Sequence, residues 1–98
     1  MIKAEYYKRV FYVAFNNGIP LILAQLMGCQ SAFETANFTS NAFIHGNNGF
    51  GYKYFDGAKL QKGNSIHSTE NDFYANYETF DNSILEVVNW IKRRVKQG

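Results

Sequence analysis

Three stretches of the chain repeat apolar residues at the spacing of an α-helix. The first predicts a helix from about Lys3 to Phe15, and an Asn-Asn-Gly sequence, which tolerates positive φ, then ends it. Pro20 suits the first turn of the next helix. That helix, Pro20–Glu34, is apolar on nearly every side, so we expect it to be the buried central helix of the fold.

The third stretch predicts a last helix from about Asp81 to Val95. We expect Asp81 to cap it and Phe80 to pack on Leu85 as a hydrophobic staple. Its final turns carry four cations, which complement the helix dipole. They are Lys92, Arg93, Arg94 and Lys96.

The region between the second and the last helix is rich in glycine and asparagine, a composition typical of turns. A short helical turn is expected near Ser40–Phe43, and Tyr52–Phe55 and Ser65–Tyr77 suit a small hairpin or irregular sheet. The chain as a whole therefore predicts one domain, residues 1–98, with an α+β fold that is predominantly α and has a small loop-rich lobe.

Composition and charge exclude several classes of function. A chain of 98 residues is too short for separate cofactor and substrate lobes, and a net charge of +2 is too small for binding nucleic acid by phosphate neutralisation. One cysteine and two histidines cannot build a disulfide or a Cys/His zinc site. The apolar run Ile19–Gly28 is shorter than the roughly 20 residues that span a bilayer. We expect a monomer without cofactor, metal ion, nucleic-acid partner or stable membrane insertion.

One carboxyl group stands alone in a long neutral stretch. Between Val10 and Tyr52 the chain has no Lys, Arg or Asp and a single Glu, Glu34, although its charged fraction of 18% predicts about eight charges there. Because Glu34 ends the most apolar helix and loss of water disfavours ionisation, we expect this carboxyl to keep its proton near neutral pH. A general acid for glycosidic cleavage requires such a group, so the sequence nominates Glu34 as a catalytic acid.

Neutral hydrogen-bonding residues surround Glu34 in the sequence. Gln30 lies one helical turn earlier on the same face, and several amides and hydroxyls follow. Such groups bind sugars or amides without neutralising the acid. The alternative interpretation is a solvated glutamate at a frayed helix end, followed by asparagines that only form turns. The residues that follow are Asn37, Ser40, Asn41, Asn47 and Asn48.

Three segments in order along the chain carry a resemblance to a known family. Gln30–Ser40 reads Gln-Ser-Ala-Phe-Glu-Thr-Ala-Asn-Phe-Thr-Ser, Asn47–Lys53 reads Asn-Asn-Gly-Phe-Gly-Tyr-Lys, and Tyr77–Ile84 opens the last helix. Together they resemble the glucosaminidase family of bacterial and phage peptidoglycan hydrolases, which belongs to the lysozyme-like superfamily. Two positions depart from the family's pattern, with Ala36 in place of the usual Gly and Gly49 in place of the usual Leu.

The resemblance implies a lysozyme-like fold and assigns roles to individual residues. Glu34 falls on the family's catalytic acid, and Tyr77 falls on a tyrosine that lines the cleft, where its hydroxyl could position the acetamido group or the attacking water. The asparagine-rich segment falls on the family's cleft motif. The expected substrate-binding residues are Gln30, Asn47, Asn48, Phe50, Tyr52 and Lys53.

The sequence does not identify the group that would stabilise the positive, oxocarbenium-like charge that develops on the sugar during cleavage. The chain has no clear copy of the lobe that carries a second acid in longer members of the family. A carboxylate of Asp56, Glu70 or Asp72 could activate water or act as nucleophile, or the substrate's own 2-acetamido group could participate. Among these acids we favour Glu70, because it follows Ser-Thr in the segment expected to form the small lobe.

These observations predict a hydrolase of the β-1,4 bond between amino sugars in peptidoglycan, in the first place an endo-β-N-acetylglucosaminidase. The alternatives are a muramidase or lytic transglycosylase of the same superfamily, or a non-catalytic wall-binding or virion structural module. An interaction role for the cations of the last helix has little support, because such charges are usually solvated. No signal peptide is evident, so we expect delivery to the periplasm or wall by lysis, a virion or a secretion apparatus.

Overall fold

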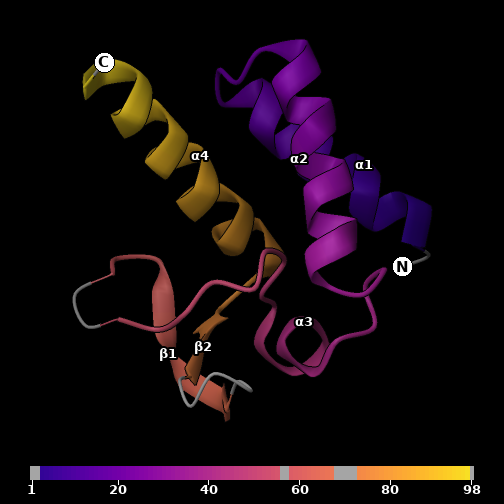
Figure 1. Ribbon diagram of the computed structural model, residues 1–98, viewed down its shortest axis with the longest axis vertical. Helices are drawn as coiled ribbons and strands as arrows, with labels where there is room; N and C mark the ends of the chain where they lie inside the picture. The colour runs from indigo at the N-terminus through magenta and orange to yellow at the C-terminus, as the bar shows by residue number, and fades with distance from the viewer. Residues whose placement is uncertain (1–2, 56–57, 68–72, 98) are drawn as a thin grey trace.

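The structure is a computed structural model that describes residues 3–55, 58–67 and 73–97; for residues 64–67 and 97 it describes the backbone alone. Within these residues, four helices and a two-stranded hairpin follow one another (Figure 1). The α+β fold dominated by helix is confirmed. The elements are α1 (Lys3–Asn16), α2 (Leu21–Glu34), α3 (Asn41–Gly46), β1 (Gln61–His67), β2 (Phe73–Tyr77) and α4 (Phe80–Gln97).

Local hydrogen bonds fix where the helices begin. Ser40 caps α3, since its hydroxyl oxygen accepts from the backbone N–H three residues later at 3.2 Å. Thr79 caps α4 in the same way, accepting from the amide of Asn82 at 3.1 Å. The prediction that Asp81 is the cap is therefore wrong. Asp81 instead joins α4 to α1, because its carboxylate accepts a bond of 2.8 Å from Nε of Arg9.

The main core lies where α1, α2 and α4 converge around the loop that carries Phe50. Its members are aliphatic except for this phenylalanine and one methionine, and burying each member larger than alanine stabilises the fold by about 1.5–3 kcal/mol. They are Val10, Ala14, Ile19, Ala24, Met27, Phe50, Ile84, Val87 and Val88.

A second packing centre is aromatic and holds α3 against α1 and the start of α4. The rings of Tyr6, Phe38, Phe43 and Phe80 meet at centroid distances of 4.8–6.4 Å, mostly edge to face. Phe80, predicted as a staple for the last helix, thus packs on three other rings that come from α1, α3 and the turn before α3.

Helix α2 is not the buried central helix that the sequence predicts. One side of it packs, and its buried residues are small except for Met27. They allow a close approach to α1: a Cβ added to Gly28 would lie 2.9 Å from the ring of Tyr7. The other side faces solvent, so the apolar composition of α2 gives an exposed apolar surface. Its exposed residues include Leu21, Ile22, Leu23, Leu26 and Phe33.

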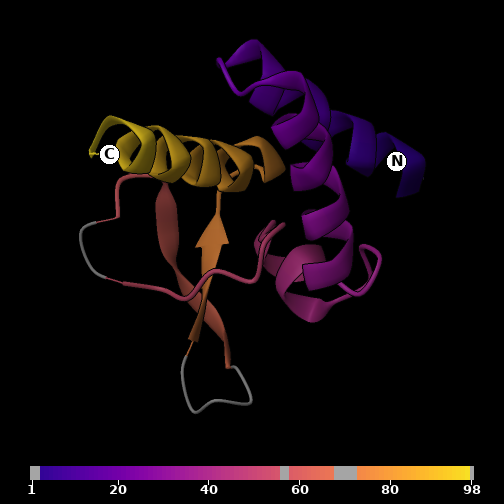
Figure 2. The same cartoon turned by 45° about the horizontal axis from the view of Figure 1, so that its top comes forward.

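The hairpin of β1 and β2 projects beneath α4 (Figure 2). The strands are antiparallel, with irregular register between Gln61 and Gly63 and again between Asn64 and Ile66. The segment 52–54 runs beside β2, bonded through Tyr54 N–H to the carbonyl of residue 73 at 2.8 Å. The predicted hairpin is thus confirmed, although β1 begins earlier than expected.

The described residues form one compact unit. The radius of gyration is 12.8 Å, close to the roughly 13 Å typical of a folded chain of this length. Among the described helices, none combines the length and the apolar character needed to cross a bilayer.

Candidate functional site

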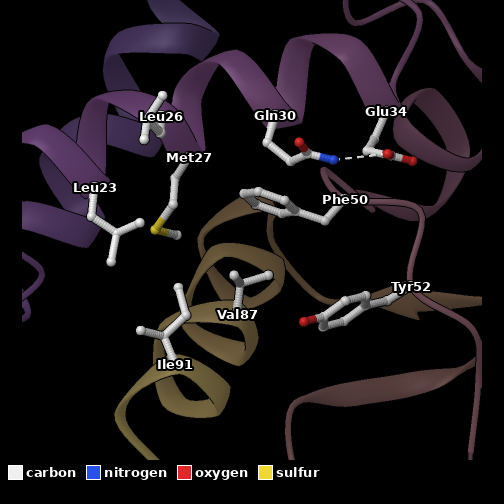
Figure 3. Close-up of a pocket in the computed structure, with 9 residues that line it drawn as sticks. All are labelled: Leu23, Leu26, Met27, Gln30, Glu34, Phe50, Tyr52, Val87 and Ile91. Carbon is white, nitrogen blue, oxygen red and sulfur yellow. Dashed lines mark hydrogen bonds between the residues drawn. The ribbon is translucent and has the colours of Figure 1, made fainter. Parts of the chain in front are cut away.

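An open hollow of about 470 Å³ lies between α2, α4 and the loop that follows α3 (Figure 3). We call it the Glu34 groove. Its walls are mostly apolar, and among them only Gln30, Glu34 and Tyr52 carry polar side-chain groups. Apolar walls with a few convergent polar groups are typical of small-molecule binding sites. The lining residues are Leu23, Leu26, Met27, Gln30, Glu34, Phe50, Tyr52, Val87 and Ile91.

Glu34 is the last residue of α2 and lies at one end of this groove. Its side chain points alongside that of Gln30, whose Nε2 donates to Oε1 at 2.8 Å (Figure 3). The expectation that Glu34 is walled off from water is wrong, because the residue is exposed. The groove supplies apolar walls but leaves the carboxyl open on one side, so a ligand in the groove would have to complete its removal from water.

The backbone of Gly51 passes close to the second oxygen of Glu34. A Cβ at this position would lie 3.4 Å from Oε2, and the residue has φ +68°. Glycine adopts this conformation without steric cost, whereas a side chain would both strain the backbone and crowd the carboxyl. Glycine at this position thus suits a loop whose backbone runs beside the carboxyl of Glu34 with positive φ.

Asn48 holds the loop that carries Phe50 and Tyr52 into the groove. It is 1% exposed, and its Nδ2 donates to the carbonyls of Tyr52 at 2.9 Å and Ala75 at 3.0 Å. Its Oδ1 accepts from the amides of Phe50 and Tyr52, each at 3.2 Å. This geometry does not support the predicted contact of Asn48 with substrate, because both ends of the amide are already occupied.

Asn47 and Gly49 also position backbone. Asn47 ends α3 with φ +54°, and its side chain donates to the carbonyl of Tyr77 at 3.1 Å. The carbonyl of Gly49 accepts from Ser31 at 2.6 Å and its amide donates to Ser83 at 3.1 Å, which ties the loop to α2 and α4. Glycine at position 49 has a steric explanation, since a Cβ there would collide with the ring of Phe80.

The turn after Glu34 has an unusual backbone. Ala36, Asn37 and Phe38 have φ of 52°, 60° and 64°, three successive left-handed residues of which none is glycine. Thr35 supports the turn, because its buried hydroxyl donates to the carbonyl of Ser31 at 2.7 Å and accepts from the amide of Phe38 at 2.8 Å.

A second carboxyl group, Glu86 on α4, faces the hairpin and was missed by sequence reasoning. Its carboxylate accepts from the hydroxyl of Tyr77 and, at 3.1 Å, from Nε2 of Gln61. Burial raises the pKa of Glu86 above its ordinary 4.5, although the Gln61 bond and the charge of Arg93 oppose the shift. The only signal in the sequence is an acid placed between Leu and Val within a helix.

The structure places Tyr77 in this second cluster. Tyr77 is 3% exposed, its hydroxyl is engaged by Glu86, and it does not line the Glu34 groove. Its predicted role beside the reacting sugar therefore receives no support from this geometry. Tyr52 connects the two regions. It lines the Glu34 groove, and the pKa of its hydroxyl is raised mainly by burial and to a smaller extent by the charge of Glu86.

A second hollow of about 440 Å³ adjoins the groove at Tyr52 and has aromatic walls formed with Phe55 and Trp90. Lys53 lines it as well, with its ammonium 4.2 Å from the ring centre of Tyr74. Trp90 was also missed by sequence reasoning. Its signal was the chain's single tryptophan placed off the apolar stripe of the last helix.

The remaining predicted acids cannot be placed. Asp56, Glu70 and Asp72 lie outside the described residues. Within the described part of the chain, no group of three or more His, Cys, Asp or Glu side chains could hold a metal ion.

The chain was compared with known proteins at three levels. No protein-family model matches it, and neither the curated proteins nor the solved structures contain a significant match.

Proposed function

We propose that the protein is a peptidoglycan hydrolase in which Glu34 protonates the leaving oxygen of a β-1,4 bond between amino sugars, in the first place as an endo-β-N-acetylglucosaminidase of lysozyme-like fold. The observation that carries this proposal is the position of Glu34: it is the one carboxylate among the residues that line an otherwise apolar and neutral groove. The sequence resemblance independently assigns the acid to this residue. The site of action would be the periplasm or the cell wall, reached by lysis, a virion or a secretion apparatus.

The hydrogen bonds of Glu34 suit a general acid. Gln30 donates to Oε1, which leaves Oε2, the oxygen on the side of Gly51, as the oxygen from which a proton would be transferred. A sugar that fills the groove displaces water from the carboxyl and leaves it against Met27, Phe50 and other apolar walls, which disfavours the ionised form. The acid is thereby prepared for proton transfer by the substrate itself.

The aromatic hollow supports binding of a glycan. Tyr52 belongs both to the Glu34 groove and to the hollow formed with Phe55 and Trp90, so the two form adjoining sites. The faces of sugar rings are apolar and pack on aromatic side chains. A strand bound across Tyr52 would thus place one sugar beside Glu34 and the next on the aromatic surface.

The positive charge that develops on the sugar needs a second group. Among the residues described, no other carboxylate lines the groove. This favours participation of the substrate's 2-acetamido group, and Glu70 remains the alternative from the segment outside the described residues.

The test is the release of reducing ends from purified cell walls. Glu34→Gln retains shape and the bond to Gln30 but cannot donate the proton, so kcat should fall by about 10²–10⁴-fold. The free energy of unfolding should change by less than about 0.5 kcal/mol, because the residue is exposed. Glu78→Gln, another exposed glutamate, is the matched control and should keep activity within about twofold.

A non-catalytic wall-binding module is the second candidate, favoured by the exposure of Glu34 and by the lack of a second carboxylate among the described residues that line the groove. Wild-type protein that sediments with walls but releases no reducing ends would establish it. An active Glu34→Gln variant would show that the acid is misassigned.

A further inference from the structure

The Glu34 groove continues into a third hollow at the end of the molecule opposite Glu34. This hollow, of about 340 Å³, shares Leu23 and Ile91 with the groove, so the two adjoin between α2 and α4. Its remaining walls come from the α1–α2 turn and the last turns of α4. They are Gly18, Ile19, Pro20, Lys92, Val95 and Lys96.

The charges along this extended groove are asymmetric. Helix α2 carries no charged residue before Glu34, whereas α4 presents Lys92 and Lys96, one turn apart, to the third hollow. The other two cations of this helix face elsewhere. Arg93 lines a separate hollow, to which Glu86 also contributes, and Arg94 lies 5.0 Å from the ring centre of Trp90. The groove therefore runs from a carboxyl through an apolar middle to two ammonium groups.

The length of the groove fits a short peptide. Leu23 lies eleven residues before Glu34 on the same helix, a rise of about 16 Å at 1.5 Å per residue. An extended peptide of four or five residues spans at most about 13–18 Å. A peptide of about five residues attached to a sugar at Glu34 would thus extend as far as Leu23, which lines the third hollow together with Lys92 and Lys96.

We propose that the extended groove binds the acidic peptide that peptidoglycan carries on its sugars, so that the enzyme prefers peptide-bearing strands to bare glycan. Small apolar side chains of the peptide lie over Leu23 and Ile91, and its free carboxylates lie at Lys92 and Lys96. This inference rests on the proposed function. An acidic peptide is favoured over an anionic bilayer because the cations line a hollow continuous with the catalytic groove.

The test compares two substrates, intact cell walls and the same walls stripped of peptides by an amidase. On intact walls, Lys92→Gln/Lys96→Gln should raise KM by about three- to tenfold at low salt with unchanged kcat, and the effect should shrink at high salt. On stripped walls the variant should match the parent. Lys3→Gln/Lys8→Gln on α1 removes the same charge from exposed positions and should match the parent on both substrates.

Direct binding provides a readout that needs no catalysis. A soluble tetrapeptide of alanine, glutamate, lysine and alanine, acetylated at its N-terminus so that two carboxylates face one ammonium, should shift the NMR methyl signals of Leu23 and Ile91 when titrated into the Glu34→Gln protein. The shifts should disappear when Lys92 and Lys96 are also replaced by Gln.

The outcomes separate this inference from the proposed function. The peptide site is overturned if the Lys92→Gln/Lys96→Gln variant hydrolyses both substrates and its KM changes equally on both, or on neither. That result leaves the glycosidase proposal intact. If the wild type cleaves neither substrate, the glycosidase proposal fails and the titration alone decides the groove. Loss of binding to anionic lipid vesicles in the lysine variant, without any effect of the peptide, would assign the cations to a membrane surface and overturn the inference.

Discussion

The two carboxyl groups Glu34 and Glu86 lie on neighbouring helices in opposite environments. Glu34 belongs to a helix without other charges, yet it is exposed and bonded to a single amide, Gln30. Glu86 belongs to a helix with several charges, yet the hairpin partly buries it and two side chains, Gln61 and Tyr77, donate to it. The carboxyl that is far from other charges in the sequence, Glu34, is therefore not the one that the fold shields from water, Glu86.

The difference shows what prepares each acid. At Glu86 the folded chain itself removes water and supplies the partners, which is the usual condition of a structural carboxyl. At Glu34 the fold supplies apolar walls but leaves the carboxyl exposed, so under the proposed function a ligand would have to complete its removal from water. An open acid in an apolar groove is the arrangement expected when substrate must enter.

The largest effect should follow from Asn48→Ala, which breaks the connection between the two regions. Asn48 ties the groove loop to β2, and its loss leaves buried carbonyls of Tyr52 and Ala75 without this donor. The free energy of unfolding, measured by urea denaturation, should fall by about 2–4 kcal/mol. Asn41→Ala, at an exposed position, should change it by less than about 0.5 kcal/mol. A loss as small as that of the control would show that Asn48 does not hold the loop.

A smaller effect of opposite sign is expected in the left-handed turn after Glu34. Ala36→Gly should raise the free energy of unfolding by about 1 kcal/mol, because glycine adopts φ 52° without the steric cost that alanine bears. Ala32→Gly within α2 is the matched control and should lower it by about 0.5–1 kcal/mol, as glycine does inside helices. Equal destabilisation by both changes would show that the turn after Glu34 is not strained.

The smallest effect concerns the pH dependence of stability at Glu86. Since folding raises its pKa above 4.5, its contribution to stability is fully present below about pH 4.5 and is lost as pH rises through the folded value. Glu86→Gln cannot ionise, so the Tm of the variant relative to wild type should increase from about pH 4 to about pH 7. The corresponding change in the free energy of unfolding should stay below about 1 kcal/mol, because the side chain of Glu86 is only partly buried and water screens its charge. A relative Tm that falls over this range would reverse the assigned environment of Glu86.

Periodicity predicted the helices well because each helical face is encoded locally. The bounds of α1 and α2 differ from prediction by one residue, and the hairpin was anticipated from the aromatic and β-branched content of its strands. Burial was predicted less well. The apolar composition of α2 suggested a central helix, whereas the chain offers too few neighbours to cover residues such as Ile22 and Phe33.

The candidate site was predicted only in part, because local sequence places some of its residues whereas others depend on distant partners. Glu34, Gln30, Phe50 and Tyr52 do line one groove, since helix spacing and a short loop place them together. The roles of the amide side chains could not be read locally, because Asn48 is satisfied by Ala75, a residue 27 positions away. Partners this distant are set by the tertiary fold.

Mass spectrometry of the fragments released from purified peptidoglycan tests the central claim most directly. The account predicts fragments with a new N-acetylglucosamine reducing end from wild-type protein, and at least about 100-fold less of them from Glu34→Gln under the same conditions. A new N-acetylmuramic acid end would shift the cleaved bond, and a 1,6-anhydro end would indicate a transglycosylase. Fragments of any of these kinds formed equally by Glu34→Gln would contradict the role of Glu34 as the acid.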